Sequence, residues 1–147
     1  MKYTYFRLVL AVLLFLGGWQ IVSAETNELM VRCVAFYNLE NVFDTIHDEG
    51  KNDYEYLPDG GMKWTSLKYT NKIQNMAYAI AQLGTDEDPR GAAIVGVSEV
   101  ENIGCLHDLC KELKEKHNRN YVPILLEGPD RRGIDVGLLY NPDMFKP

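Results

Sequence analysis

Four short apolar runs along the chain predict four β-strands. The first is interrupted only by Arg32, and a nearly continuous run of this kind predicts a strand that is buried on both faces. The last two runs are joined by Gly128-Pro129-Asp130, a composition typical of a turn. The predicted strands are residues 30–37, 92–97, 121–126 and 134–140.

Two segments with a 3.6-residue hydrophobic period predict helices after the first and second strands. In the first helix, apolar residues recur at helical spacing over residues 73–83, Thr65 or Ser66 provides the N-cap, and Gly84 ends the helix. The second helix covers residues 103–117, with leucine and cysteine on one face and lysine and glutamate on the other.

The order strand, helix, strand, helix, strand, strand predicts an α/β fold. A strand–helix–strand unit normally makes a right-handed crossover between parallel strands, so the first two strands end at the same edge of one sheet. Ligands of open α/β sheets bind beyond such strand ends. The polar segment 38–63 is a long loop, and loops of this length are often functional. Its Tyr54, Tyr56 and Trp64 either stack on a base or sugar or, as we favour, pin the loop to the body.

Two polar clusters follow the first two predicted strands. The first comprises residues 38–41 with Asp44 close by, and the second comprises residues 98–102. Carboxylates at a strand end suit a hard divalent cation such as Mg²⁺, which completes its shell with water and phosphate oxygens. Within such a site, Asn38 can hold Glu99 or a phosphate oxygen by hydrogen bonding.

The same clusters have an ordinary structural interpretation. Asparagine and glutamate commonly cap turns and helices, and Glu101 and Asn102 stand where the second helix begins. Spacing alone therefore leaves both the metal-site and the capping interpretations open.

A third polar cluster precedes the last predicted strand. Adjacent arginines at a turn, here Arg131 and Arg132, can bind phosphate, but a solvated turn with an Arg–Asp pair is the interpretation that the local pattern favours. Asp135 opens the apolar strand, where an unpaired charge is costly. We therefore expect Asp135 to have a partner such as Arg132.

The amino-terminal segment is typical of an export signal. In residues 1–24, Lys2 and Arg7 precede an apolar run over residues 8–16, and the small residues at 22–24 suit cleavage. The run is too short to favour a membrane span. We expect an exported chain without a stable membrane span after cleavage, in the periplasm or outside the cell.

Composition and charge exclude several classes. A chain with 46% hydrophobic and 24% charged residues is neither disordered nor of low complexity. The net charge of −6 becomes about −8 after removal of the signal, which disfavours non-specific capture of nucleic acid. Cys33 is expected to pack as a small hydrophobe, and Cys105 and Cys110 are spaced too poorly on a helix to face each other. No cysteine metal cluster is present, and we do not favour a disulfide.

Three segments in succession resemble motifs of the endonuclease/exonuclease/phosphatase superfamily, which includes DNase I-like nucleases, apurinic endonucleases, sphingomyelinases and inositol-phosphate phosphatases. The segments are residues 36–41, 95–102 and 131–140. Three motifs in order are far more specific than any one alone. The resemblance implies a four-layer α/β sandwich with two central sheets packed face to face. It also implies hydrolysis of a phosphoester by an activated water, with Mg²⁺ or Mn²⁺ as cofactor.

The resemblance also assigns roles to individual residues. Asn38 matches the asparagine of the family's first strand, which orients the phosphate and the metal ligand. Glu99 matches the metal-binding glutamate, and both residues belong to the catalytic set. Glu40 falls where some members place a further acidic residue near the metal. The resemblance implies a phosphoester substrate, of nucleic acid, lipid or sugar, and the sequence does not choose among them.

The later motifs of the family are absent from the sequence. Members continue with Asp-x-Asn and a histidine-containing motif, and none of the histidines here (His47, His107 and His117) lies in the matching context. Residues 25–147 therefore resemble the amino-terminal half of such a domain, catalytically incomplete as given, and we expect a missing carboxy-terminal half and poor stability for this half alone. The alternative is a non-catalytic binding module, or a degenerate half-domain that pairs with another chain.

Overall fold

The computed structural model describes residues 30–146. By its internal contacts the chain divides into Met1–Met30 and Val31–Pro147, and the fold described below belongs to the second unit. The predicted signal segment, residues 1–24, lies outside the described residues. Among the described helices, none has the length and apolar character that a membrane crossing requires.

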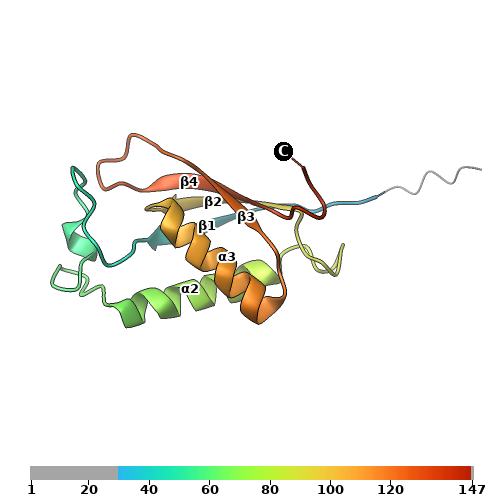
Figure 1. The fold of residues 1–147 in the computed structure, drawn as a ribbon, viewed down its shortest axis with the longest axis horizontal. Coiled ribbons are helices and arrows are strands. Elements are labelled where there is room, and N and C mark those ends of the chain that lie inside the picture. Colours follow the sequence, from blue (N-terminus) through green and yellow to red (C-terminus); the bar gives the residue numbers. More distant parts are fainter. Residues whose placement is uncertain (1–29, 147) are drawn as a thin grey trace, which may run out of the picture. The chain divides into compact units, whose positions relative to one another are not determined.

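One mixed four-stranded sheet and two helices form the fold, which is therefore α/β (Figure 1). The sheet order is β1-β2-β4-β3; β1 and β2 are parallel, and the other neighbours are antiparallel. The parallel pairing of the first two strands agrees with the crossover predicted from the sequence. The elements are β1 (Val34–Val42), the 3₁₀ turn η1 (Tyr54–Tyr56), α2 (Ser66–Ala81), β2 (Ile94–Val100), α3 (Ile103–His117), β3 (Val122–Leu126) and β4 (Asp135–Tyr140).

Local caps explain why the helices begin where they do. The Thr65 side chain accepts a hydrogen bond from the backbone N–H of Lys68, and the Asn102 side chain accepts one from Cys105 at 3.0 Å. Beyond the end of α2, Gly84 has φ +74°, and a Cβ there would lie 2.7 Å from the Cys33 sulfur. Glycine is therefore required at this turn for both backbone and steric reasons.

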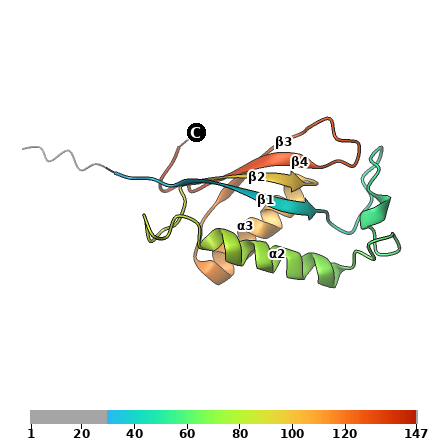
Figure 2. The same cartoon turned by 180° about the vertical axis from the view of Figure 1, so that it is seen from behind.

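Both helices cover the same face of the sheet, as the two opposite views show (Figures 1 and 2). The side chains between the helices and the sheet are almost fully excluded from solvent and form one core. Burial of this apolar area is the main stabilising contribution to the fold. The fully buried members include Ile80, Leu106, Leu109, Leu113, Val95, Val97 and Leu139.

The opposite face of the sheet is apolar but uncovered within the described residues. Val34 and Phe36 of β1 are each 69% exposed, so the prediction that the first strand is buried on both faces is wrong for this unit. The physical reason is that β1 is an edge strand and the described helices pack on one side only. The cross-strand rows on this face are Val34–Ile94–Tyr140–Val122, Phe36–Gly96–Leu138–Ile124 and Asn38–Ser98–Val136–Leu126.

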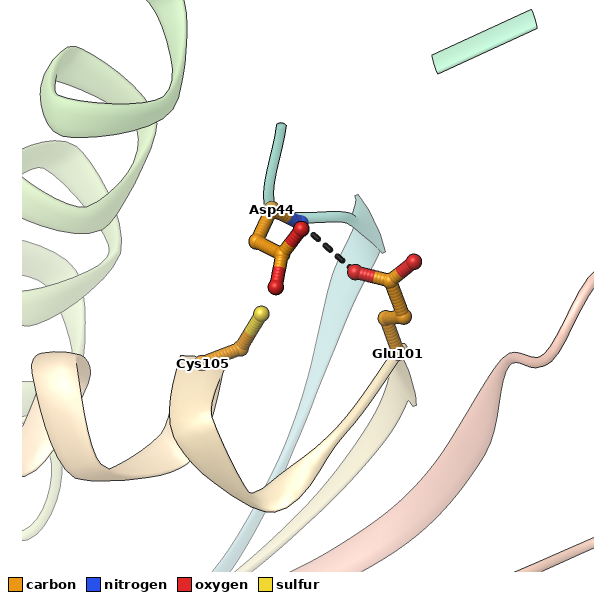
Figure 3. A group of neighbouring side chains, drawn as sticks. All are labelled: Asp44, Glu101 and Cys105. Atoms are coloured by element: carbon orange, nitrogen blue, oxygen red, sulfur yellow. Dashed lines mark hydrogen bonds between the residues drawn. The ribbon is translucent and has the colours of Figure 1, made fainter. Parts of the chain in front are cut away.

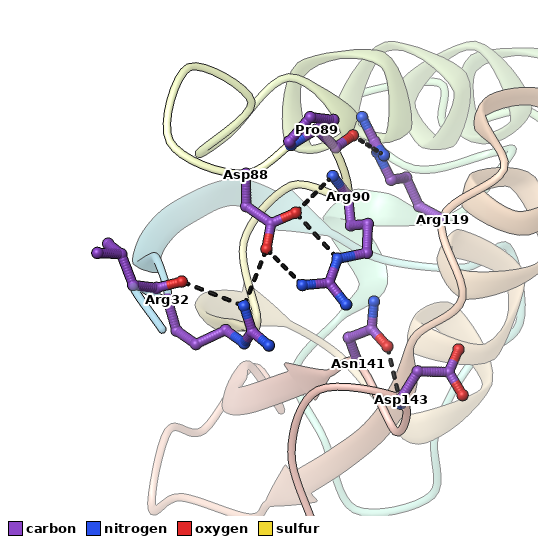
Figure 4. A network of polar contacts seen from close by, with 8 residues as sticks. Arg32, Asp88, Pro89, Arg90, Arg119, Asn141 and Asp143 are labelled. Carbon is purple, nitrogen blue, oxygen red and sulfur yellow. Dashed lines mark hydrogen bonds and ion pairs between the residues drawn. The ribbon is translucent and has the colours of Figure 1, made fainter. Parts of the chain in front are cut away.

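A polar network fixes the segment that precedes β1 to the loop that precedes β2 (Figure 4). Arg90 donates two side-chain hydrogen bonds to Asp88, at 3.0 and 2.8 Å, and Arg32 forms an ion pair with the same carboxylate at 3.1 Å. The hydrogen bonds from Arg90 lower the pKa of Asp88 to about 2. Charge-assisted bonds therefore help to hold this end of the sheet.

Candidate functional site

The first polar cluster lies within β1 rather than after it. The strand continues to Val42, five residues beyond the predicted end, because its pairing with β2 resumes after an irregularity. Glu40 and Asn41 in β1 and Glu99 in β2 have φ of 55°, 63° and 61°. Non-glycine residues with positive φ are uncommon and concentrate at functional sites. A local distortion of two neighbouring strands therefore marks the sheet edge that the sequence indicated.

Asn38 connects the two strand-end clusters. Its Nδ2 donates to Oε1 of Glu99 at 3.1 Å, and its Oδ1 accepts from the backbone N–H of Glu40 at 2.8 Å. One asparagine thus sets the orientation of the Glu99 carboxylate and the position of the Glu40 backbone. The structure brings all three predicted site residues together, while their roles in catalysis and metal binding stay predictions.

Two cations flank this group from different elements. Lys72 of α2 donates from Nζ to the backbone carbonyl of Glu40 at 2.8 Å. Burial lowers the pKa of Lys72, and the charges of Glu40 and Glu99 oppose that shift. On the other side, Arg132 donates from Nη1 to Oδ1 of Asn41 at 3.2 Å. The edge thus combines two carboxylates with an ammonium and a guanidinium.

The turn before β4 has the Arg–Asp pair that the local pattern favoured. Arg132 bonds to both carboxylate oxygens of Asp130. The prediction that Arg132 pairs with Asp135 is wrong. Asp135 instead accepts a 2.6 Å hydrogen bond from the backbone N–H of Gly128. The β3–β4 turn folds back onto Asp135, so a backbone donor of the turn, rather than an arginine, bonds to the buried carboxylate.

A second carboxylate pair lies deeper, beside the start of α3 (Figure 3). Ligand atoms of Asp44, Glu101 and Cys105 lie within 4.8 Å of one another, and the backbone N–H of Asp44 donates to Glu101 at 2.7 Å. Burial is the main cause that raises the pKa of Glu101 to about 8 and that of Cys105 to about 12. A protonated thiol is a poor metal ligand. Within the group, hydrogen bonds from the Asp44 backbone to Glu101 and from Asn102 to Asp44 fix the two carboxylates.

The sequence placed Asp44 and Glu101 in separate clusters and Cys105 on the apolar face of a helix. The signal that relates them is the N-cap Asn102, which bonds to the Cys105 backbone and to the Asp44 carboxylate at 3.1 Å. An N-cap asparagine brings the third helical residue next to whatever precedes the helix. The capping interpretation of Asn102 is thus confirmed.

A hollow of about 600 Å³ opens beside Glu99. It lies between the end of β2 and the β3–β4 turn, so a ligand that reaches Glu99 meets a partly enclosed surface. Its lining includes Ser98, Leu126, Pro129, Ile134 and Val136.

Tyr56 and Trp64 hold the long loop against the buried Phe43, as predicted, whereas Tyr54 is exposed and contacts a residue of the same loop. Trp64 donates from its indole nitrogen to the carbonyl of Phe43 at 2.7 Å, and Tyr56 stacks on the Phe43 ring at 4.0 Å between centroids. Tyr54 stacks on His47, which in turn bonds to the buried Asp53. These contacts fix the loop beside the sheet edge.

The other two histidines belong to α3. His107 is exposed, and His117, the last residue of α3, is half-buried with its ring edge-on to Tyr78. Cys105 and Cys110 are buried and Cys33 is half-buried, and all three are free thiols.

Comparison with known proteins identifies a family. The sequence model of a family described as "Endonuclease/Exonuclease/phosphatase family" matches residues 33–147, which include every helix and strand of the described fold. No curated protein and no solved structure matches the chain.

Proposed function

The chain belongs to the endonuclease/exonuclease/phosphatase family, and on that premise we propose that it acts in the metal-dependent hydrolysis of a phosphoester. The observation that carries the proposal is the Asn38–Glu99 hydrogen bond, which joins the first two motifs at one sheet edge. A metal-binding carboxylate needs a fixed orientation, and a neighbouring amide donor supplies it.

The donor set at this edge fits a hard divalent cation. Glu99 and Glu40 offer carboxylate oxygens from adjacent strands, and Mg²⁺ and Mn²⁺ prefer such ligands. A cation bound there would polarise a phosphoryl oxygen and lower the pKa of a bound water. We assign metal binding to Glu99 with help from Glu40, and assign to Asn38 the positioning of Glu99 and of the phosphate.

We further propose that a second sheet covers the open face and completes the four-layer sandwich. Six exposed apolar side chains support this, because two sheets that pack face to face each present an apolar inner surface. They are Val34, Phe36, Val122, Ile124, Leu126 and Val136. In this proposal residues 25–147 form the amino-terminal part of the domain, and the general base belongs to the part that supplies the second sheet. Residues 1–24 direct export.

Membership of the family implies a phosphoester substrate but does not identify the alcohol or phosphate groups that it contains. Nucleic acid, lipid and sugar phosphates stay alternatives, and the acidic net charge of −6 disfavours tracking along duplex DNA.

Hydrolysis of bis-p-nitrophenyl phosphate with Mn²⁺ tests the proposal. We expect turnover only when the part that supplies the second sheet is present, with loss of that turnover in Glu99→Gln and unchanged turnover in the matched control Glu115→Gln, whose side chain is exposed on α3. Equal turnover in both variants would contradict the assignment of Glu99. No turnover in any form, together with Mn²⁺ binding that does not depend on Glu99, would favour the non-catalytic binding module.

A further inference from the structure

The guanidinium of Arg132 is held between two segments that are far apart in the sequence. Its Nε and Nη2 bond to Oδ1 and Oδ2 of Asp130 at 3.3 and 3.2 Å, and its Nη1 bonds to Oδ1 of Asn41 at 3.2 Å. A two-point contact with a carboxylate and a third bond to an amide fix the guanidinium plane. Arg132 is therefore oriented before any ligand arrives.

These contacts leave part of the donor capacity of Arg132 available. A guanidinium has five N–H donors, of which the bonds to Asp130 and Asn41 use three. One donor on each terminal nitrogen is left over. The side chain is 42% exposed, so an incoming acceptor can approach the guanidinium. Two donors on a planar fork match two oxygens of a phosphate.

Arg132 lies near the proposed metal ligand. Asn41, its amide partner, follows Glu40 in the left-handed stretch of β1, and the charge of Glu99 acts on Arg132. No hydrogen bond joins Arg132 to Glu99 among the described residues. A carboxylate and a guanidinium that are close without being bonded suit a phosphate shared between a metal ion and an arginine.

We propose that Arg132 binds the phosphate of the substrate, donating its two remaining N–H groups to non-bridging oxygens. This inference rests on the proposed function and adds a substrate-binding residue to it. In an acidic chain, an anion at the carboxylate edge needs local positive charge. Lys72, the other cation at this edge, is less suited, because its ammonium is half-buried and donates to the Glu40 carbonyl.

The competing explanation is that Arg132 only braces the β3–β4 turn against β1. A side chain with only this bracing role contributes to stability and to the geometry of Glu40 and Glu99, but it does not bind phosphate. The two explanations therefore predict different phosphate affinities for an Arg132 variant that still binds the metal as tightly as the wild type.

Titration calorimetry of inorganic phosphate into the Mn²⁺-loaded full chain separates them. The matched control is Arg131→Gln, because Arg131 is adjacent and exposed and its side chain has no hydrogen bond or ion pair among the described residues. We expect phosphate affinity to fall roughly tenfold or more in Arg132→Gln, because a charge-assisted bidentate contact contributes at least about 1.4 kcal/mol. Arg132→Lys should be intermediate, and Arg131→Gln should match the wild type.

Metal affinity, measured in the same proteins, distinguishes failure of this inference from failure of the proposed function. Unchanged phosphate affinity in Arg132→Gln with Mn²⁺ bound, or no phosphate binding by the Mn²⁺-loaded wild type, would overturn the role of Arg132. Mn²⁺ binding that is insensitive to Glu99→Gln would instead overturn the proposed function.

A measurement on the wild type removes dependence on the folding of the variants. The side-chain ¹⁵N resonances of Arg132 should shift as phosphate is added to the Mg²⁺-loaded protein, while those of Arg131 should stay in place. Equal shifts at both arginines, or no shift at Arg132, would overturn the inference.

Discussion

The buried carboxyl of Glu101 should make the free energy of unfolding depend on pH. Glu101 is 4% exposed and lies close to Asp44, while Asp48 and Asp53 add further negative charge. Burial, with these charges, raises the pKa of Glu101 from 4.5 to about 8. Between these two pH values the folded protein holds a proton that the unfolded chain has released. The free energy of unfolding therefore falls as pH rises through this window.

The size of this effect follows from the pKa shift. One pKa unit corresponds to about 1.36 kcal/mol, so the shift of Glu101 amounts to roughly 4–5 kcal/mol across the window. Glu101→Gln keeps an oxygen that can accept from the backbone N–H of Asp44 and removes the ionisation. In the variant this part of the pH dependence should be absent.

Chemical denaturation from pH 5 to pH 8 with a chelator present measures the effect. The wild type should lose stability relative to Glu101→Gln as pH rises, with most of the difference between pH 5 and pH 8. Glu115→Gln, at an exposed position of α3, should follow the wild type. If the wild type and Glu101→Gln have parallel pH profiles, the carboxyl is not held protonated and the reasoning from burial is wrong.

Three further substitutions probe the fold. Gly137→Ala should destabilise the protein by about 1–3 kcal/mol in thermal unfolding, because its Cβ would lie 2.8 Å from the Leu106 side chain; an unchanged Tm would contradict this packing. Asn102→Ala should reduce the free energy of unfolding by about 1 kcal/mol through loss of the α3 cap, and Asn102→Ser should recover part of it in urea denaturation. The wild type should lose stability as pH falls from about 4 to about 2, as the Asp88 carboxylate bonded to Arg90 is protonated. Asp88→Asn should be less stable above pH 4 and lose less below it, and equal acid sensitivity of the two proteins would refute that contribution.

The helices were predictable because their determinants are local. Thr65, one of two predicted caps, begins α2, and Asn102 caps α3, which has the predicted bounds Ile103–His117. The helix α2 ends at Ala81, shortly before the predicted stop at Gly84. Capping and the hydrophobic period depend on residues within one or two turns, which a single sequence contains.

The distortion at the strand ends was not predictable from the sequence. The left-handed residues Glu40, Asn41 and Glu99 arise where β1 and β2 leave register and resume it at Val42 and Val100. Such an irregularity depends on pairing between segments about sixty positions apart, and the local composition contains no signal for it. The same holds for Asp135, whose backbone partner depends on how the β3–β4 turn folds.

The burial of β1 was mispredicted for a related reason. An apolar run indicates that both faces of a strand are buried, but it does not indicate which segment covers each face. In the described unit the helices cover one face, and Val34 and Phe36 stay exposed on the other. The run is explained if the second face packs on a second sheet, as we propose.

The central claim is that Glu99, oriented by Asn38, binds a divalent cation at the edge of the sheet. Calorimetric titration of Mn²⁺ into the wild type, Glu99→Gln and Glu115→Gln tests it most directly. We expect one Mn²⁺ site in the wild type and in Glu115→Gln, and loss of that site in Glu99→Gln with an unchanged Tm. The same Mn²⁺ affinity in all three proteins would contradict it.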